Sequence, residues 1–440
     1  MTLLRPDVSG ADVFSEIRSL ARPLTSAEDL DPLIERVSAD RYVCIGEASH
    51  GTHEYYRWRA LLSRRLIEEH GFTWIGVEGD WPDCWRINRW VRGQGDQDLD
   101  VYGLLDRFER WPTWMWANQE VAEFLAWLRE WNAVRPEHER VGFYGLDVYS
   151  LWDSLREIIS WLESNAPDAV PAAMRAWECF VPHHEDPHAY ARSTRLVPES
   201  CEADVVALLV EVRSRTHHLL NDDEDAFDAE QNAEVAADAE HYYRIMVRGD
   251  RESWNIRDYH MADTIERVAR HLGPQSKGLV WEHNTHVGDA RATDMARDGL
   301  VNVGQLIRER HTAQGVALVG FASHRGTVLA AAAWGAPESV LPVPEARTNS
   351  HEDLLHRALG EPAVLVFGDD RSGPWLSAWL HHRAIGVVYQ PQREHGNYVP
   401  TRIGGRYDAL IWLEQTTALQ PLHHENRPQE PELETEPTGY

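Results

Sequence analysis

The first motif able to do acid–base chemistry contains a glutamate and a histidine. Glu47 and His50 lie three residues apart in the glycine-flanked segment 46–51, GEASHG. At this spacing the carboxylate can orient the imidazole, and a histidine that titrates near neutral pH can take a proton from water. A polar turn with a helix-capping histidine explains the same residues equally well, because short motifs often match by chance.

A second motif, residues 283–286, contains two histidines. His283 and His286 are three residues apart, so both could bind one metal ion, or one could act as an acid while the backbone holds the other. On its own, such a pair is more often two solvated loop histidines. It gains weight because it follows an apolar run, as Glu47 and His50 do.

Further polar residues follow apolar runs or lie on the next helix. Glu78 ends such a run, where a buried carboxylate is costly unless it is paired or functional. Arg59 follows His50 by nine residues and could pair with Glu78 or hold an oxyanion, although a solvated helix face is the commoner role. For Asp147 and His324 we favour a structural hydrogen bond at a strand end.

The apolar runs themselves predict the fold. Each of five short runs is followed closely by Glu, Asp or His, and they lie at residues 42–45, 74–77, 141–146, 278–281 and 316–321. Helical spacing over residues 54–70 separates the first two. Short buried strands alternating with helices predict an α/β fold with a mostly parallel sheet flanked by helices. Ligands bind at the carboxyl ends of such strands, so we expect the polar residues to converge there.

The remaining segments suggest a domain organisation. Residues 1–150 and 272–420 would form the two parts of an α/β catalytic core, with further strands at 364–367 and 384–389. Residues 151–271 are acidic and carry helical spacing at 204–212 and 226–247, which predicts an α-helical insertion that roofs one side of the cleft. Residues 421–440, rich in Pro and Glu, predict a disordered acidic tail. Thr25 and Glu28 have the spacing of a capping box.

Composition excludes several classes of function. The net charge of −28 over 440 residues makes nucleic acid an unfavourable partner. Lys277 is the only lysine, which confines Schiff-base chemistry to that position. No apolar stretch is long enough for a membrane span, and the first 24 residues do not read as a secretory signal. The four cysteines, none of them in a Cys-x-x-Cys pair, suggest reduced thiols in a cytoplasmic protein.

Several catalytic signatures are absent. The sequence has no Gly-x-Ser-x-Gly elbow, no Walker loop and no dinucleotide fingerprint. Nothing marks Ser49 as a nucleophile. The remaining interpretation is attack by water with the help of a base, on a small-molecule substrate and without a cofactor. The 19 Trp residues belong mostly in the core, while a minority could line an apolar pocket.

Several motifs in order along the chain resemble the erythromycin esterase family, some of whose members are labelled succinoglycan biosynthesis proteins. They are residues 47–52 (EASHGT), 77–81 (VEGDW), 112–118 (PTWMWAN), 142–150 (GFYGLDVYS), 255–261 (NIRDYHM), 283–289 (HNTHVGD), 383–389 (RAIGVVY) and 406–409 (RYDA). The resemblance spans roughly residues 30–415. It implies a Gly-Glu-x-x-His core and a metal-independent hydrolase that opens esters or lactones, with macrolide lactones as known family substrates.

The resemblance also implies roles for individual residues. It makes His50 the general base and Glu47 its orienting carboxylate, and it places Arg59, Glu78, His283 and His286 in the same cleft. The position before His283 is usually small in the family but is Glu282 here, which would alter the charge of the site. We expect substrate-binding side chains at Trp81, Trp114, Met115, Trp116, Asp147, Glu282 and His324.

Two other functions compete with metal-free hydrolysis. A metal-dependent hydrolase could use Glu47, His50, His283 and His286 as ligands. Alternatively, the same base could catalyse a cyclisation or dehydration in secondary metabolism. Metal analysis separates the first alternative from ours, and a product profile separates the second.

Overall fold

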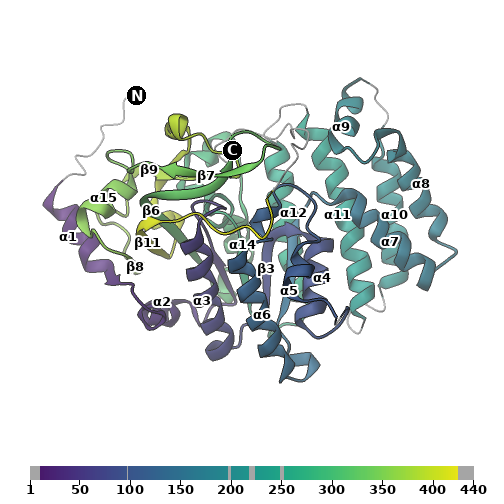
Figure 1. The fold of residues 1–440 in the computed structure, drawn as a ribbon, viewed down its shortest axis with the longest axis horizontal. Helices are drawn as coiled ribbons and strands as arrows, with labels where there is room; N and C mark the ends of the chain where they lie inside the picture. Colours follow the sequence, from purple (N-terminus) through teal and green to yellow (C-terminus); the bar gives the residue numbers. More distant parts are fainter. Residues whose placement is uncertain (1–9, 97, 197–199, 218–222, 248–251, 425–440) are drawn as a thin grey trace.

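The computed structural model describes residues 10–96, 98–196, 200–217, 223–247 and 252–424. Most of the predicted acidic tail, residues 425–440, lies outside these ranges. The described strands form a nine-stranded sheet in the order β1-β8-β11-β6-β2-β5-β3-β4, with β7 paired to β6 (Figure 1). Their bounds are β1 Ala21–Pro23, β2 Tyr42–Ile45, β3 Trp74–Asp80, β4 Gly142–Asp147, β5 Gly278–Trp281, β6 Val316–Ala331, β7 Glu338–Val343, β8 Ala363–Val366 and β11 Ala409–Thr416.

The central strands are parallel, as the sequence predicts. β2 pairs with β5 and β6 in parallel, β3 pairs in parallel with β4 and β5, and β11 pairs in parallel with β6. Within the described part of this sheet, antiparallel pairs lie toward one side, where β8 joins β1 and β11 and where β7 joins β6. The four strands β2, β5, β3 and β4 therefore end together at one edge.

Helices cover both faces of the sheet because successive strand residues point to opposite sides. Val43 and Ile45 of β2 belong to a core with α2, α3 and α6, whereas Tyr42 and Cys44 belong to a core with α4, α12, α14 and α15. The bounds are α2 Asp31–Val37, α3 His53–His70, α4 Trp81–Val91, α6 Gln119–Ala133, α12 Glu252–His271, α14 Val303–His311 and α15 His351–Ala358. This two-sided burial explains why the strands read as continuous apolar runs.

Beside the sheet lies a helical lobe with its own core (Figure 1). It contains α7 Leu151–Asn165, α8 Val170–Phe180, α9 Pro187–Leu196, α10 Glu202–Thr216 and α11 Glu224–Met246. The described residues of segment 151–271 contain no strand. Their last helix, α12, leaves the lobe and packs against the sheet.

The helical lobe corrects the expectation of reduced thiols. Cys179 near the end of α8 and Cys201 before α10 form a disulfide, with their Cα atoms 5.9 Å apart. Because the two residues are brought together by the packing of α8 against α10, their separation of 22 residues in the sequence gave no sign of the pairing. Cys44 and Cys84 are buried free thiols.

Three local expectations are wrong. The capping box uses Ser26 and Asp29 rather than Thr25 and Glu28, because the helix begins one residue later and the Asp29 carboxylate accepts from the Ser26 N–H at 2.9 Å. β6 continues to Ala331, held by β11 and β7, so His324 does not follow a strand end. Residues 384–389 form only isolated bridges, and the nearby strand is β9 Trp379–Arg383, paired with β10 Tyr398–Arg402.

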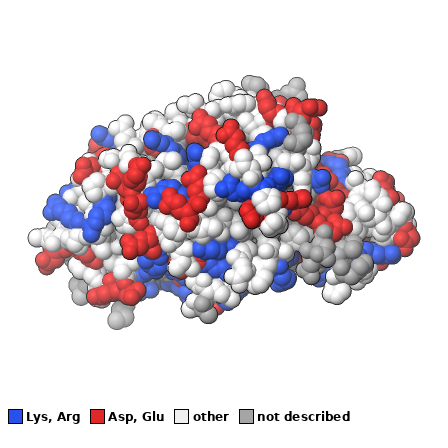
Figure 2. All heavy atoms as spheres, turned by 90° about the horizontal axis from the view of Figure 1, so that it is seen from below, with Lys and Arg blue, Asp and Glu red and all other residues white. Residues whose placement is uncertain are grey.

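The charge on the surface and the character of the helices concern possible partners and membranes. Figure 2 shows acidic and basic side chains interspersed over one face of the molecule. Despite the net charge of −28, this face does not present a field of one sign. None of the described helices combines the length and the apolar character that crossing a membrane requires.

Candidate active site

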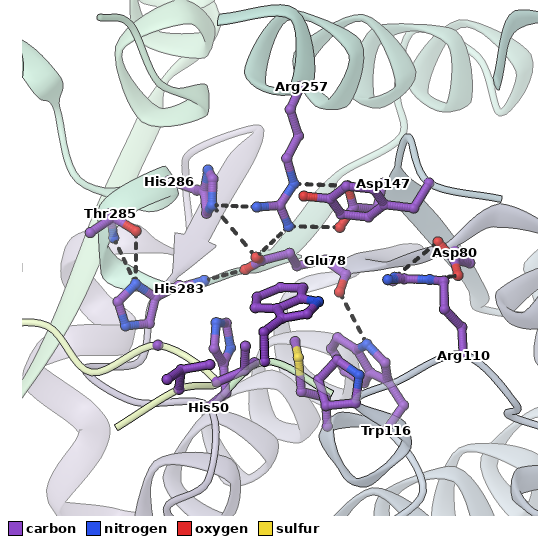
Figure 3. Close-up of a pocket in the computed structure, with 18 of the residues that line it drawn as sticks. His50, Glu78, Asp80, Arg110, Trp116, Asp147, Arg257, His283, Thr285 and His286 are labelled. Atoms are coloured by element: carbon purple, nitrogen blue, oxygen red, sulfur yellow. Dashed lines mark hydrogen bonds and ion pairs between the residues drawn. The ribbon is translucent and has the colours of Figure 1, made fainter. Parts of the chain in front are cut away.

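A cavity of about 290 Å³ lies where β2, β5, β3 and β4 end (Figure 3). His50 follows β2, His283 follows β5, Glu78 lies in β3 and Asp147 ends β4. Side chains from α11 and α12, among them Tyr242 and Arg257, form another part of the wall. The convergence that the strand pattern predicted therefore exists for four of the five runs, whereas His324, after the fifth run, does not line the cavity.

Glu47 holds His50 in position. The Nδ1 of His50 lies 2.8 Å from Glu47 Oε1, so the Nδ1–H can donate to the carboxylate and Nε2 is left as a basic nitrogen. Arg59 Nη1 lies 3.3 Å from the other oxygen of Glu47. The glycine before Glu47 has a steric purpose, since a Cβ on Gly46 would lie 2.2 Å from Asn284 Oδ1.

His283 lies beside His50, with ring centroids 4.8 Å apart. Its Nδ1 is 2.8 Å from Thr285 Oγ1 and accepts from the Thr285 N–H at 3.3 Å. An accepting Nδ1 leaves Nε2 to carry the proton. Burial, together with the neighbouring His50, holds the pKa of His283 well below its usual value, so this imidazole is a neutral hydrogen-bond donor.

An arginine joins two buried carboxylates at the centre of the cavity wall (Figure 3). Arg257 donates to Asp147 through Nε at 2.9 Å and Nη2 at 2.7 Å, and Nη2 also donates to Glu78 at 2.7 Å. The other oxygen of Glu78 accepts from the His283 N–H at 2.8 Å. Burial raises the pKa of Glu78, but His286 and Arg257 outweigh it and leave that pKa below its ordinary value.

His286 completes this network. Its Nδ1 lies 3.0 Å from Asp258 Oδ1, its Nε2 lies 3.5 Å from Glu78 Oε1, and its ring stacks on Trp254 at 4.6 Å. Burial opposes protonation, but the Asp258 and Glu78 carboxylates outweigh it and raise the pKa of His286. The imidazolium form is thereby favoured, even though Arg257 Nη1 lies 3.3 Å from Nε2.

The rest of the cavity is largely apolar. Trp116 donates from Nε1 to the Glu78 carbonyl at 3.0 Å, which fixes its ring at the cavity wall. Arg110 pairs with Asp80 and lies over Tyr149, whose ring is also contacted by Arg257. Further apolar lining comes from Phe108, Pro112, Met115, Trp254, Trp334, Val387 and Val388.

The structure brings together most of the residues expected in the site. His50, Glu78, His283, His286, Met115, Trp116 and Asp147 line the cavity, and Glu47 touches it through His50. The other expected residues, Arg59, Trp81, Trp114, Glu282 and His324, do not line it.

Arg59 and Trp81 are held elsewhere by packing. Arg59 is fully buried between the rings of Tyr56 and Trp281, so the expected pair with Glu78 does not form and the guanidinium cannot reach an oxyanion in the cavity. Trp81 stacks on Trp85 and donates to Asp228.

Trp114, His324 and Glu282 are also outside the cavity. Trp114 is fully buried in the core on the α3 side, and His324 stacks on His356. Both carboxyl oxygens of Glu282 are buried without a hydrogen-bond partner among the described residues.

Sequence reasoning missed Arg257, Asp258, Tyr149, Trp254, Arg110 and Trp334. Arg257 and Asp258 lie in the segment 255–261, one of the motifs that resemble the family. That motif was the one sequence feature that could have pointed to these two residues. The sequence around them predicts a helix, but helical spacing does not tell which charged residue of the helix faces the sheet.

The comparisons with known proteins agree with this architecture. The erythromycin esterase family model matches residues 67–416, and the chain belongs to that family, which supports a hydrolase-like activity. The chain is 31% identical over 129 residues to erythromycin esterase type II of Escherichia coli, an alignment covering 29% of this chain and 28% of that enzyme. It is 20% identical over 420 residues to the putative hydrolase YbfO of Bacillus subtilis, covering 90% and 89%.

Solved structures share the fold. A succinoglycan biosynthesis protein aligns with a TM-score of 0.74 at 20% identity, covering 92% of this chain and 97% of that one. A Bacillus cereus protein aligns with a TM-score of 0.77 at 20% identity, covering 93% and 98%. A mutant of the erythromycin esterase EreC in its open conformation aligns with a TM-score of 0.64 at 17% identity, covering 89% and 95%.

Proposed function

We propose that the chain hydrolyses a carboxylic ester or lactone of a small molecule with water activated by His50, without a metal. The observation that carries this proposal is the 2.8 Å contact between His50 Nδ1 and Glu47 Oε1, at the wall of a cavity that His50 lines. A carboxylate on Nδ1 fixes the tautomer in which Nε2 is the base and stabilises the imidazolium that forms during the reaction.

The reaction then needs only one base. As the water oxygen attacks the carbonyl carbon, its proton passes to His50 Nε2 and the carbonyl oxygen becomes an oxyanion. The bond from this carbon to the alcohol oxygen breaks next, and the departing alkoxide takes the proton back from His50. The products are a carboxylic acid and an alcohol, which remain in one molecule when the substrate is a lactone.

His283 is the best-placed donor to the oxyanion. Its ring lies beside His50, and its Nε2 makes no hydrogen bond in the described part of the chain, although the Ala48 carbonyl is nearby. A neutral imidazole that already carries its proton can stabilise developing charge without a large rearrangement. Arg257 and His286 hold Glu78, which accepts the backbone N–H of His283, and so fix this donor.

The residues of the cavity wall favour one kind of substrate and also help to judge the competing metal-dependent mechanism. Its apolar residues suit a substrate with a substantial hydrocarbon surface. The Arg257 guanidinium already supplies a positive charge beside Glu78, Asp147 and His286. Within the described residues, the only His, Cys, Asp or Glu cluster with all ligand atoms within 4.8 Å of one another lies elsewhere.

The helical segment 151–271 contributes residues to the proposed substrate site. Tyr242 of α11 and Arg257 of α12 line the cavity, so segment 151–271 would cover one side of the bound substrate. The division into a core of residues 1–150 and 272–420 around this helical roof remains part of the proposal.

The test is a hydrolysis screen over macrolide lactones and simple esters, with and without chelator. We expect His50→Asn to lower kcat by about 10²–10⁴-fold, the usual contribution of a positioned general base. His53→Asn is the matched control. His53 also binds a glutamate, with Nδ1 2.7 Å from Glu120 Oε1, but it does not line the cavity, so this variant should keep wild-type activity.

Two further readouts separate the alternatives. In ¹⁸O-labelled water, hydrolysis places one label in the product acid, whereas a cyclisation or dehydration places none. Loss of turnover on chelation, with recovery on adding zinc or manganese, would make His50 a ligand and replace our mechanism with a metal-dependent one.

A further inference from the structure

A second cluster of chemically capable side chains lies away from the cavity, where α15 packs on the sheet. It consists of His324 on β6, Glu414 on β11 and His356 on α15. One ligand atom from each lies within 4.8 Å of the others. His324 and Glu414 are neighbours because β6 and β11 pair in parallel, with Leu413 opposite Ser323 and Gln415 opposite Arg325.

Two polar atoms of this cluster are buried without a partner. His324 is 4% exposed, and its Nδ1 makes no hydrogen bond within the described part of the chain. Glu414 binds His356 Nδ1 through Oε1 at 2.6 Å, but its buried Oε2 has no hydrogen-bond partner among the described residues. Buried polar atoms normally have a hydrogen-bond partner. These two atoms both carry free lone pairs, so a bound ligand that accepts lone pairs would supply the missing partner.

The ligand that suits these atoms is a transition-metal cation. Two imidazoles and one carboxylate, with an open position for water, are a ligand set that zinc adopts in proteins. Metal binds a neutral imidazole through the lone pair of a ring nitrogen, and the unpartnered Nδ1 of His324 is a nitrogen that can supply one.

Binding requires one local movement. The two rings stack in parallel, with centroids 3.8 Å apart and planes 5° apart, whereas a metal must lie in the plane of each ring that binds it. His324 is fixed in the sheet, but the side chain of His356 is 40% exposed and can turn. Zinc–ligand bonds of about 2.1 Å allow ligand atoms at most about 4.2 Å apart, so any pair of ligand atoms farther apart than this, within the 4.8 Å that the cluster spans, would have to move closer.

We propose that His324, His356 and Glu414 form a zinc site that fastens α15 to strands β6 and β11. None of the three lines the catalytic cavity, so the bound ion would have a structural function. The site is independent of the proposed hydrolysis, which needs no ion there.

The test is zinc titration of the purified, metal-stripped full-length protein by calorimetry, followed by replacement with Co²⁺. We expect one zinc equivalent and a Co²⁺ visible spectrum typical of four or five ligands. His356→Ala and Glu414→Gln should each weaken binding at least about 100-fold, more than loss of an outer-shell partner does. Zinc should also raise the Tm of the wild type by about 2 °C or more and leave that of His356→Ala unchanged.

His53→Ala is the control, because His53 is similarly exposed and also pairs with a glutamate but has no third ligand among the residues that the structure describes. This variant should bind zinc as the wild type does. The proposal is overturned if no zinc equivalent binds, or if His356→Ala retains it. It is likewise overturned if His283→Ala removes the equivalent instead, which would place the ion in the catalytic cavity and count against metal-free hydrolysis as well.

Discussion

Glu282 provides a sharp test of the electrostatics beneath the active site. Its carboxyl group is fully buried, and neither oxygen has a hydrogen-bond partner among the described residues. Burial, reinforced by the charges of Glu78 and Asp258, raises its pKa well above the ordinary value of 4.5. We therefore expect Glu282 to be a neutral carboxylic acid in the folded protein and an ionised carboxylate in the unfolded chain at pH 7.

The substitution Glu282→Gln replaces this group with a permanently neutral one of the same size. When the pKa of a group is higher in the folded protein than in the unfolded chain, its contribution to the stability of the fold is complete at pH values below the unfolded pKa. This contribution is lost as the pH rises through the folded pKa. Above pH 4.5 the wild type should therefore lose stability relative to the variant by up to about 1.4 kcal/mol per pH unit, until the pH reaches the folded pKa of Glu282. Between pH 5.5 and 7.5 the difference should therefore change in favour of the glutamine variant.

The assay is urea unfolding followed by tryptophan fluorescence at pH 5.5, 6.5 and 7.5, comparing midpoints at a common m-value. Glu68→Gln, at an exposed position of α3, is the control and should show almost no pH-dependent difference. If the stability curves of the wild type and Glu282→Gln run parallel over this range, Glu282 is ionised in the folded protein and the reasoning is refuted.

Three other variants test the network and the lobe. Arg257→Ala removes the cation that joins the buried carboxylates of Asp147 and Glu78 and should lower the free energy of unfolding by about 3–5 kcal/mol; a loss under about 1 kcal/mol in urea unfolding would contradict this. Glu47→Gln should lower kcat, by less than His50→Asn does, because it impairs orientation of the base without removing it; unchanged kcat would exclude the orienting role. Cys179→Ser removes the bond to Cys201 and should cost about 2–4 kcal/mol of stability, and thiol counting on the denatured wild type should find the disulfide intact.

Local patterns in the sequence determined the framework of the site. The apolar runs marked the strands correctly at β2 and β5, because a buried parallel strand needs apolar residues on both faces. The carboxyl ends of such strands meet at one edge, so the positions of His50, Glu78 and His283 followed from chain order. The Glu47–His50 contact could also be anticipated, since it joins residues only three apart.

Only the tertiary structure decided which distant side chains meet at this edge. Arg257 is 110 residues from Asp147 and 179 from Glu78, and its contacts depend on how α12 packs against the sheet. Arg59 had an equally suitable type and spacing, yet α3 buries it between two aromatic rings.

The same distinction explains the disulfide and the cluster around His324. Cys179 and Cys201 meet through the packing of α8 on α10, and His356 reaches His324 because α15 lies on β6. Sequence periodicity sets which face of an element is apolar. It does not set the rotation and offset of one element against another, because these depend on the fit of side chains across the whole interface.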